Sequence, residues 1–276
     1  MTAEQRRPRK AVIPAAGFGT RMLSITKGKP KELLCLGRQV MLQYVVDEAV
    51  ASGIEEICVV IRQNKEAIRE FFDGHLSDNG ERKKAVARSV TPARHCRITF
   101  VDQPHPLGLG DALFQARDFV GTDSFVMMIP DQLMRAKVPA TLQLLNRWRP
   151  GPFIWSSLLR LPKDEVPFFV GARGVEYRET GSSEVEIFRL TSEEETRCAH
   201  AGLAYEVRGF GRTIYPPEIF EYLGANFKDP VTGEVDLLKT FERCTERLRI
   251  FGVWLEGEPF DFGTIPSYQR YLPRFI

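Results

Sequence analysis

The sequence predicts an α/β protein with a mixed, mostly parallel central sheet and helices on both of its faces. Short unbroken apolar runs, typical of strands buried on both faces, occur at residues 11–13, 57–61, 98–101 and 125–129. Segments with helical spacing of apolar residues lie between the first runs, so strand and helix alternate along the opening third of the chain. The second half holds short β-rich runs broken by glycine and charge, which predicts a largely antiparallel insertion.

The length and charge of the chain set bounds on its organisation. With 276 residues and 43% hydrophobic content, the chain can bury a substantial core. We expect one domain over residues 1–276, with two halves at 9–150 and 151–276. Lysine and arginine total 38 against 36 aspartates and glutamates, a formal net charge of +2. This balance argues against nucleic acid or an anionic membrane as a partner, so the basic residues matter only locally.

The cysteines and histidines predict neither a disulfide framework nor a zinc site. The five cysteines are scattered, odd in number and without C-x-x-C pairing, and the four histidines have no common spacing. No apolar signal core precedes the first strand, and no run approaches transmembrane length. We therefore expect a soluble cytoplasmic protein.

A basic, glycine-rich loop follows the first strand. Pro14 has no N–H to donate, so we expect ladder pairing to end there. Gly17 and Gly19 permit positive φ and a close backbone approach, which lets successive N–H groups converge on an anion. The loop carries four cations before Glu32, namely Arg21, Lys27, Lys29 and Lys31. This pattern predicts a phosphate-binding loop, and the alternative interpretation is a solvated basic surface loop.

Two familiar phosphate loops do not fit this stretch. It lacks the G-x-x-x-x-G-K-[ST] order of a P-loop, and Arg21 and Met22 stand where a dinucleotide fingerprint needs its third glycine. The order G-x-G-T-R-M, followed by Pro30-Lys31-Glu32, instead resembles the signature of the sugar-1-phosphate nucleotidylyltransferases. Within that family, the run KAVIPAAGFGTRM is most similar to the bacterial UTP:glucose-1-phosphate uridylyltransferases. The resemblance implies a Rossmann-like nucleotide-diphospho-sugar transferase fold.

The elements after this loop continue the alternation of strand and helix. Apolar residues recur at helical spacing over 41–50, and Ser52-Gly53 can supply a C-terminal cap. Beyond the strand at 57–61, we expect a helix over about 65–72 and a polar, solvated insertion over 73–97. The strand at 98–101 leads into a second loop, 103–110, with a helix from Asp111. Loops that leave the carboxyl ends of strands are where open α/β sheets bind ligands.

The resemblance gives the two loops nucleotide-binding roles and so makes 9–150 the nucleotide half. Gln103 and Gly108 match the positions that read the nucleobase, although an ordinary strand-to-helix turn is the alternative. Arg21 is expected on the departing β- and γ-phosphates and Lys31 on the α-phosphate, which makes these two residues the catalytic candidates. Further nucleotide contacts are expected from Ala15, Ala16, Gly17, Gly19 and Thr20.

Two aspartates are predicted to hold a divalent cation in this family pattern. Asp131 follows the apolar run 125–129, and Asp261 lies in a late stretch that follows a strand and precedes a helix. Nucleotidyl transfer moves negative phosphoryl oxygens past one another, so Mg²⁺ held by one or two carboxylates suits the chemistry. The resemblance makes Asp131 the first metal ligand and Asp261 the second. The alternative is that each carboxylate only caps a helix or starts a turn.

The half 151–276, which the resemblance makes the sugar and metal half, departs from the family pattern. The family has a tyrosine-glycine step near Phe168-Phe169 and a Glu-Lys-Pro motif near Phe188-Arg189-Leu190. Both are missing from this sequence. The expected elements are β-rich runs at 153–159, 166–172, 185–188 and 201–207, a helix from 232 to about 246 and a strand over 248–255.

Candidates for the sugar-phosphate side are Glu32, Arg189 and Glu234. If Phe169 points into the acceptor pocket, its ring removes volume and hydrogen-bonding surface that glucose hydroxyls would use, and we expect poor turnover of glucose 1-phosphate. Strand alternation offers the other interpretation, in which Phe169 faces the core.

These residues and the family resemblance together imply Mg²⁺-dependent transfer of a nucleotidyl group from UTP, or from dTTP, to a sugar 1-phosphate. The sugar-phosphate oxygen attacks the α-phosphate in line, pyrophosphate leaves, and no covalent enzyme intermediate is required. The rival hypothesis is a regulatory or degenerate relative that binds nucleotide but has lost sugar turnover. We also expect a homo-oligomer, either a dimer or a tetramer.

Overall fold

The structure is a computed structural model of the chain, and it describes residues 7–73, 96–169, 174–180, 184–224 and 227–276. The strands are β1 (Lys10–Pro14), β2 (Cys35–Leu36), β3 (Gln39–Val40), β4 (Glu56–Ile61), β5 (Arg97–Asp102), β6 (Phe125–Met128), β7 (Gln132–Arg135), β8 (Phe153–Pro162), β9 (Gly174–Glu179), β10 (Glu184–Thr191), β11 (Tyr205–Tyr215), β12 (Arg249–Trp254) and β13 (Glu258–Asp261). The α-helices are α1 (Leu23–Thr26), α2 (Met41–Ala51), α3 (Glu66–Asp73), α5 (Gly108–Gln115), α6 (Arg117–Val120), α7 (Ala140–Leu145), α8 (Glu193–Ala199), α9 (Leu237–Cys244) and α10 (Ile265–Tyr271).

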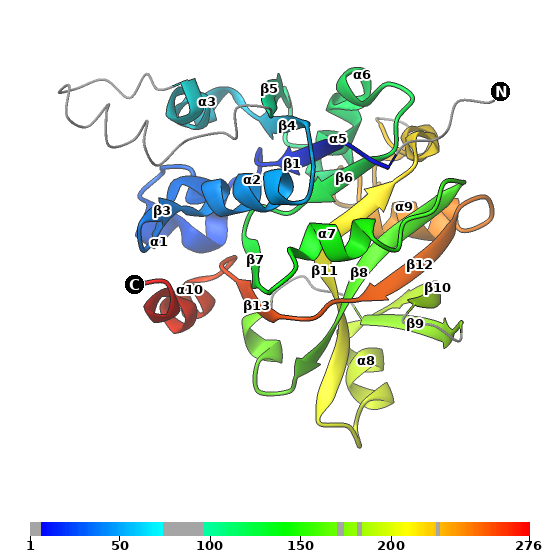
Figure 1. Cartoon of the computed structure of the whole chain (residues 1–276). Coiled ribbons are helices and arrows are strands. Elements are labelled where there is room, and N and C mark those ends of the chain that lie inside the picture. The colour runs from blue at the N-terminus through cyan, green and yellow to red at the C-terminus, as the bar shows by residue number, and fades with distance from the viewer. Residues whose placement is uncertain (1–6, 74–95, 170–173, 181–183, 225–226) are drawn as a thin grey trace.

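Within the described residues, nine strands form one sheet in the order β5-β4-β1-β6-β11-β8-β12-β10-β9 (Figure 1). The strands β5, β4, β1 and β6 run parallel to one another, as the alternation of strand and helix predicts. β11 is antiparallel to both β6 and β8, and β10 is antiparallel to both β12 and β9, while β8 and β12 pair in parallel. The predicted mixed sheet is therefore confirmed, and β11 joins its two halves.

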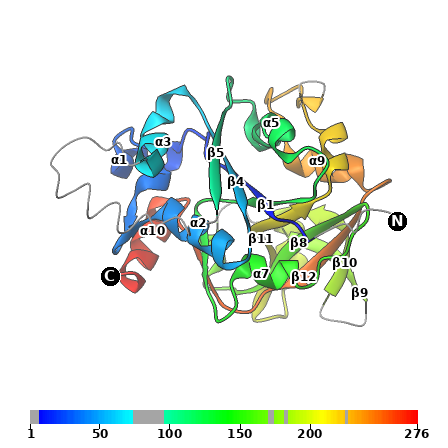
Figure 2. The ribbon, with the colours of Figure 1, turned by 45° about the horizontal axis from the view of Figure 1, so that its top comes forward.

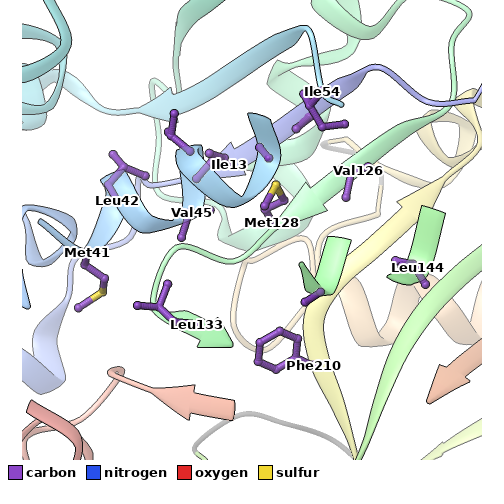
Figure 3. Close-up of a cluster of buried hydrophobic side chains, with 14 of the residues drawn as sticks. Ile13, Met41, Leu42, Val45, Ile54, Val126, Met128, Leu133, Leu144 and Phe210 are labelled. Carbon is purple, nitrogen blue, oxygen red and sulfur yellow. The ribbon is translucent and has the colours of Figure 1, made fainter. Parts of the chain in front are cut away.

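Helices cover both faces of this sheet, as predicted (Figures 1 and 2). One buried cluster contains residues of α2 and α7 with Ala11 and Ile13 of β1, and the other contains residues of α5 and α9 with Val12. Successive strand residues point to opposite faces, so the run 11–13 serves both clusters. Figure 3 shows the first cluster, which includes Val45 of α2, Ile13 of β1 and Met128 of β6. No helix among the described residues is long and apolar enough to cross a membrane.

The structure corrects several predicted boundaries in the nucleotide half. β1 includes Pro14, and the N–H of Ala15 still donates to the oxygen of Val60 at 2.8 Å, because proline removes only its own donor from the ladder. α5 begins at Gly108 and not at Asp111. The predicted insertion 73–97 lies outside the described residues except at its two ends, where α3 includes Asp73 and β5 begins at Arg97.

Further corrections concern the other half. The expected run 166–172 begins as a 3-10 helix, Val166–Phe168, because proline at its second position suits the start of a helix and cannot donate to a strand; its end lies outside the described residues. The run 201–207 becomes a strand only from Tyr205, after a turn that follows α8, and it continues to Tyr215. The helix expected from 232 begins at Leu237.

Candidate active site

The glycine-rich loop brings Arg21 and Lys31 to one side of the sheet, beyond the carboxyl end of β1. Gly19 has φ +66°, a left-handed conformation that favours glycine, and it starts the 3-10 helix Thr20–Met22. A Cβ built on Gly19 would lie 3.6 Å from Cδ of Lys31, so the loop backbone runs directly beside the lysine side chain. Lys31 itself begins the 3-10 helix Lys31–Leu33.

Lys31 forms an ion pair with Asp131, the residue that follows the end of β6. Its Nζ lies 2.5 Å from Oδ2 of Asp131, and the two side chains are 15% and 12% exposed. Burial alone would raise the pKa of Asp131, but the Lys31 ammonium outweighs burial and holds that pKa below its usual value. Burial would likewise lower the pKa of Lys31, and the charges of Asp131 and Glu32 raise it instead. Both groups are therefore charged at neutral pH.

Asp261 lies beside Asp131, because β13 pairs with β7 and places Asp261 opposite Gln132. Gln132 Nε2 donates to Oδ2 of Asp261 at 2.9 Å, and the N–H of Gly263 donates to Oδ1 at 2.7 Å. Burial, and then the charge of Asp131, raises the pKa of Asp261 to about 7. Two adjacent carboxylates repel each other when both are ionised, and a bound cation would offset that repulsion.

The space between the two carboxylates is open because residue 263 is glycine. A Cβ there would lie 2.9 Å from Oδ1 of Asp261 and 3.2 Å from Oδ2 of Asp131. Hard oxygen donors of this kind suit Mg²⁺, which is commonly held by one or two carboxylates together with substrate phosphates. Among the described residues, no group of three or more histidine, cysteine, aspartate or glutamate residues is arranged to hold a metal. Asp131 and Asp261 thus fit the cation that the family pattern implies.

Two cavities meet at Arg21 and Lys31. The larger, of about 450 Å³, includes Asp131 and Asp261 in its wall. The smaller, of about 350 Å³, includes Gln103, Gly108, Ala16, Gly19 and Thr20. The residues common to both walls are Pro14, Gly17, Arg21, Lys31 and Leu109. Arg21 and Lys31 therefore stand where a molecule in one cavity would contact a molecule in the other.

The backbone of Ala15 is not available to a ligand in this arrangement. Its N–H donates to Val60, and its oxygen accepts a hydrogen bond of 2.6 Å from Lys65 Nζ. Ala15 is fully buried, whereas Ala16 and Gly17 reach the cavity walls. The expected backbone contact from Ala15 is therefore corrected, and Ala16 and Gly17 remain candidates. Of the loop cations, Lys27 and Lys29 are exposed and line neither cavity.

A buried ion pair, which no sequence motif indicates, holds the glycine-rich loop in place. Lys65 Nζ donates to both carboxylate oxygens of Glu32, at 2.8 and 3.0 Å, in addition to Ala15. Glu32 is 1% exposed and Lys65 is 4% exposed. Glu32 is thus held by a lysine of the chain, and it also lies in the wall of the larger cavity, so its role on the sugar phosphate stays a prediction. The pair ties the end of β1 to the segment that carries Lys31.

A second missed pair anchors the turn that carries Asp131. Arg212 of β11 is fully buried and forms a bidentate bond to Glu48 of α2, at 2.8 and 2.7 Å. The same guanidinium donates to the backbone oxygens of Ile129 and Gln132, at 3.2 and 3.0 Å, on either side of Asp131. No sequence motif marks this pair, because its members lie 164 positions apart and each resembles an ordinary surface charge.

The structure shows where three residues expected on the sugar side lie. Arg189 lines neither cavity and is instead bound to Glu176 and Glu195, because the pairing of β10 with β9 shifts register between Ile187 and Arg189. Phe169 is buried in the core and lies edge-on to Tyr271, so it does not enter the acceptor side. Glu234 lines the smaller cavity with Gly108 and not the larger one.

The comparisons with known proteins agree with this geometry. The model of the nucleotidyl transferase family matches residues 10–148, and the chain belongs to that family. It is similar to the UTP--glucose-1-phosphate uridylyltransferase of Streptococcus pneumoniae serotype 4 (strain ATCC BAA-334 / TIGR4), with 34% identity over 92% of this chain and 86% of the relative. The enzyme of the same name from Bacillus subtilis (strain 168) is 31% identical over the same shares of the two chains.

Solved structures share the fold of this chain. A UDP-glucose pyrophosphorylase complexed with UDP-glucose superimposes with a TM-score of 0.80 at 23% identity, over 97% of this chain and 98% of the other. A UTP-bound enzyme of this kind from Acinetobacter baumannii gives a TM-score of 0.78 at 23% identity, over 97% and 93% of the two chains. The predicted α/β fold class, the family resemblance and the assignment as a nucleotidyltransferase are confirmed.

Proposed function

We propose that the protein transfers the uridylyl group of UTP to a sugar 1-phosphate, with Mg²⁺ bound by Asp131 and Asp261. The observation that carries this proposal is the junction of two cavities at Arg21 and Lys31, directly beside the paired carboxylates. The nucleotide occupies the smaller cavity and the sugar 1-phosphate the larger one. The names of the two curated relatives support UTP as the donor and glucose 1-phosphate as the reference acceptor.

In this reaction the chain supplies alignment and charge. Lys31 stabilises the charge that develops on the α-phosphate, and Arg21 contacts the departing β- and γ-phosphates. The Lys31–Asp131 pair holds the ammonium in place before substrate binds, so little reorganisation is needed during the reaction. Losing one such preorganised cation costs on the order of 3 kcal/mol in the transition state, or about a hundredfold in rate. Bound Mg²⁺ supplies further charge neutralisation on the phosphoryl oxygens.

The acceptor end of the larger cavity is less polar than a site for a fully hydroxylated sugar requires. Beyond Asp131, the described residues of its wall include the polar side chains of Gln132, Ser156, Thr213 and Tyr215. They also include an apolar group formed by Val175, Ile187, Leu190, Leu237, Phe241 and Ile250. Neither Arg189 nor Phe169 reaches it. We therefore keep the expectation of weak glucose 1-phosphate turnover, with a specificity constant below about 10⁴ M⁻¹s⁻¹, on the ground of this apolar wall and not of Phe169.

The same wall favours a second candidate function, a relative that binds UTP and does not turn over a sugar phosphate. Arg189, the cation nearest in sequence to the missing Glu-Lys-Pro motif, is occupied by Glu176 and Glu195. Against this candidate stands the set of Arg21, Lys31 and two adjacent carboxylates, because nucleotide binding alone does not need both aspartates.

The test is pyrophosphate release from UTP with Mg²⁺ across a panel of sugar 1-phosphates, with the Lys31→Ala variant as the control. A productive acceptor whose turnover needs Lys31 supports the transferase. Tight UTP binding without pyrophosphate release for any acceptor supports the second candidate. Absence of UTP binding would contradict both. Cytoplasmic location and a dimer or tetramer remain proposals, which fractionation and analytical ultracentrifugation test.

A further inference from the structure

We propose that Asp111 is a positioning residue that fixes the side-chain amide of Gln103, so that the site accepts a base with a ring N–H and rejects a base with an unprotonated ring nitrogen there. This inference rests on the proposed function, because it takes the smaller cavity as the nucleotide site. Gln103 stands in the wall of that cavity, together with Gly108 at the start of α5.

The orientation of the Gln103 amide follows from the chemistry of its partners. Its Nε2 lies 2.8 Å from Oδ2 of Asp111 and 3.0 Å from the backbone oxygen of Gly108. Both partners are acceptors only, so the NH₂ group must face them, and both of its hydrogens are used. Rotating the amide by half a turn would set its oxygen against a carboxylate oxygen and a carbonyl oxygen.

Burial of both side chains fixes this orientation of the Gln103 amide. Gln103 is 5% exposed and Asp111 is 4% exposed, so water does not compete freely for either group. The backbone N–H of Gln103 donates to the oxygen of Ile61 at 2.7 Å, and Gln115 Nε2 donates to the other oxygen of Asp111 at 3.1 Å. The amide and the carboxylate are thus both fixed, and Oε1 of Gln103 accepts no hydrogen bond from a described residue.

The side-chain amide of Gln103 can therefore offer a ligand one acceptor oxygen and no donor. Uracil and thymine carry a hydrogen on N3 and can donate to it. Cytosine presents an unprotonated N3, and adenine an unprotonated N1, so either base would place acceptor against acceptor in a site with little water. Guanine also has a ring N–H, and this rule does not separate it from uracil. Asp111 would thus set the choice of pyrimidine without contacting the base.

The experiment measures the dissociation constants of UTP and CTP by titration calorimetry with Mg²⁺ and without an acceptor. Hydrogen-bonded sites discriminate strongly against a mismatched partner, so we expect wild type to prefer UTP by roughly a hundredfold. Asp111→Leu removes the acceptor at similar size and lets the amide turn, and we expect the preference to fall to within about fivefold. Gln115→Leu removes only the second bond to Asp111 and should keep the wild-type ratio.

A second variant keeps the inference testable if Asp111→Leu does not fold. Asp111→Ala also removes the carboxylate that accepts from Gln103 and should lower the UTP preference in the same way. An unchanged ratio in either folded variant would overturn the role of Asp111. Failure of wild type to bind UTP would instead contradict the proposed function, so the two failures are distinguishable.

Discussion

Replacing Lys65 by methionine should destabilise the protein strongly although Lys65 lies on neither cavity wall. Its ammonium uses all three hydrogens, on Ala15 and on both oxygens of Glu32. Methionine fills similar space but leaves the Glu32 carboxylate, 1% exposed, without its cation. Removing one partner of a buried ion pair costs about 3–5 kcal/mol. For a chain of this size, that cost corresponds to a fall in Tm of about 6–20 °C.

The assay is thermal unfolding followed by circular dichroism, with urea unfolding as an independent probe. Arg69→Met is the matched control, because Arg69 lies on the adjacent helix α3 and its 3.1 Å pair with Glu66 is solvent-exposed, so its loss should cost under about 1 kcal/mol. The double variant Glu32→Gln with Lys65→Met removes both charges and should recover part of the loss. A Tm for Lys65→Met within about 2 °C of wild type, or no recovery in the double variant, would refute the reasoning.

Three further predictions concern the site and its support. Lys31→Ala should lower turnover by about a hundredfold or more while reducing Tm less than Lys65→Met, and equal activity of variant and wild type in pyrophosphate release would contradict its role. Asp131→Asn and Asp261→Asn should each shift the Mg²⁺ titration of activity to higher concentration, because each removes one anionic ligand, and unchanged curves would place the cation elsewhere. Arg212 outweighs burial and lowers the pKa of Glu48, so this pair stabilises the fold above the unfolded pKa of about 4.3 and loses that effect as the pH falls through the folded value. The Tm of wild type should therefore fall more steeply below about pH 4.3 than the Tm of Glu48→Gln, and parallel pH profiles would exclude the pair as the cause.

Local patterns in the sequence predicted the parallel half of the sheet and the two loops at its edge. The run 11–13 is apolar on both faces because it serves both hydrophobic clusters, and a short apolar run of this kind is typical of a central strand. Arg21, Lys31, Asp131 and Asp261 were predicted because each lies in a short motif, and the structure brings all four to the larger cavity.

The features that sequence reasoning missed depend on long-range pairing. Lys65 and Glu32 are 33 positions apart, and each was placed in the sequence as part of a different segment. Their burial follows from the position of the 3-10 helix Gln63–Lys65, which brings Lys65 against Ala15 and Glu32. The position of Arg189 depends on a register shift between β10 and the edge strand β9, which no local pattern indicates. The ring of Phe169 lies in the core, which is the second of the two interpretations of this residue.

Transfer of the α-phosphorus of UTP is the central claim, and isotope labelling tests it most directly. UTP carrying ³²P at the α or the γ position is incubated with Mg²⁺ and each sugar 1-phosphate, and the products are separated by chromatography. We predict that the α label moves into a UDP-sugar and the γ label into pyrophosphate, and that both transfers are about a hundredfold slower with Lys31→Ala. Transfer of the γ label to the sugar, or its release as free phosphate, would contradict nucleotidyl transfer at this site.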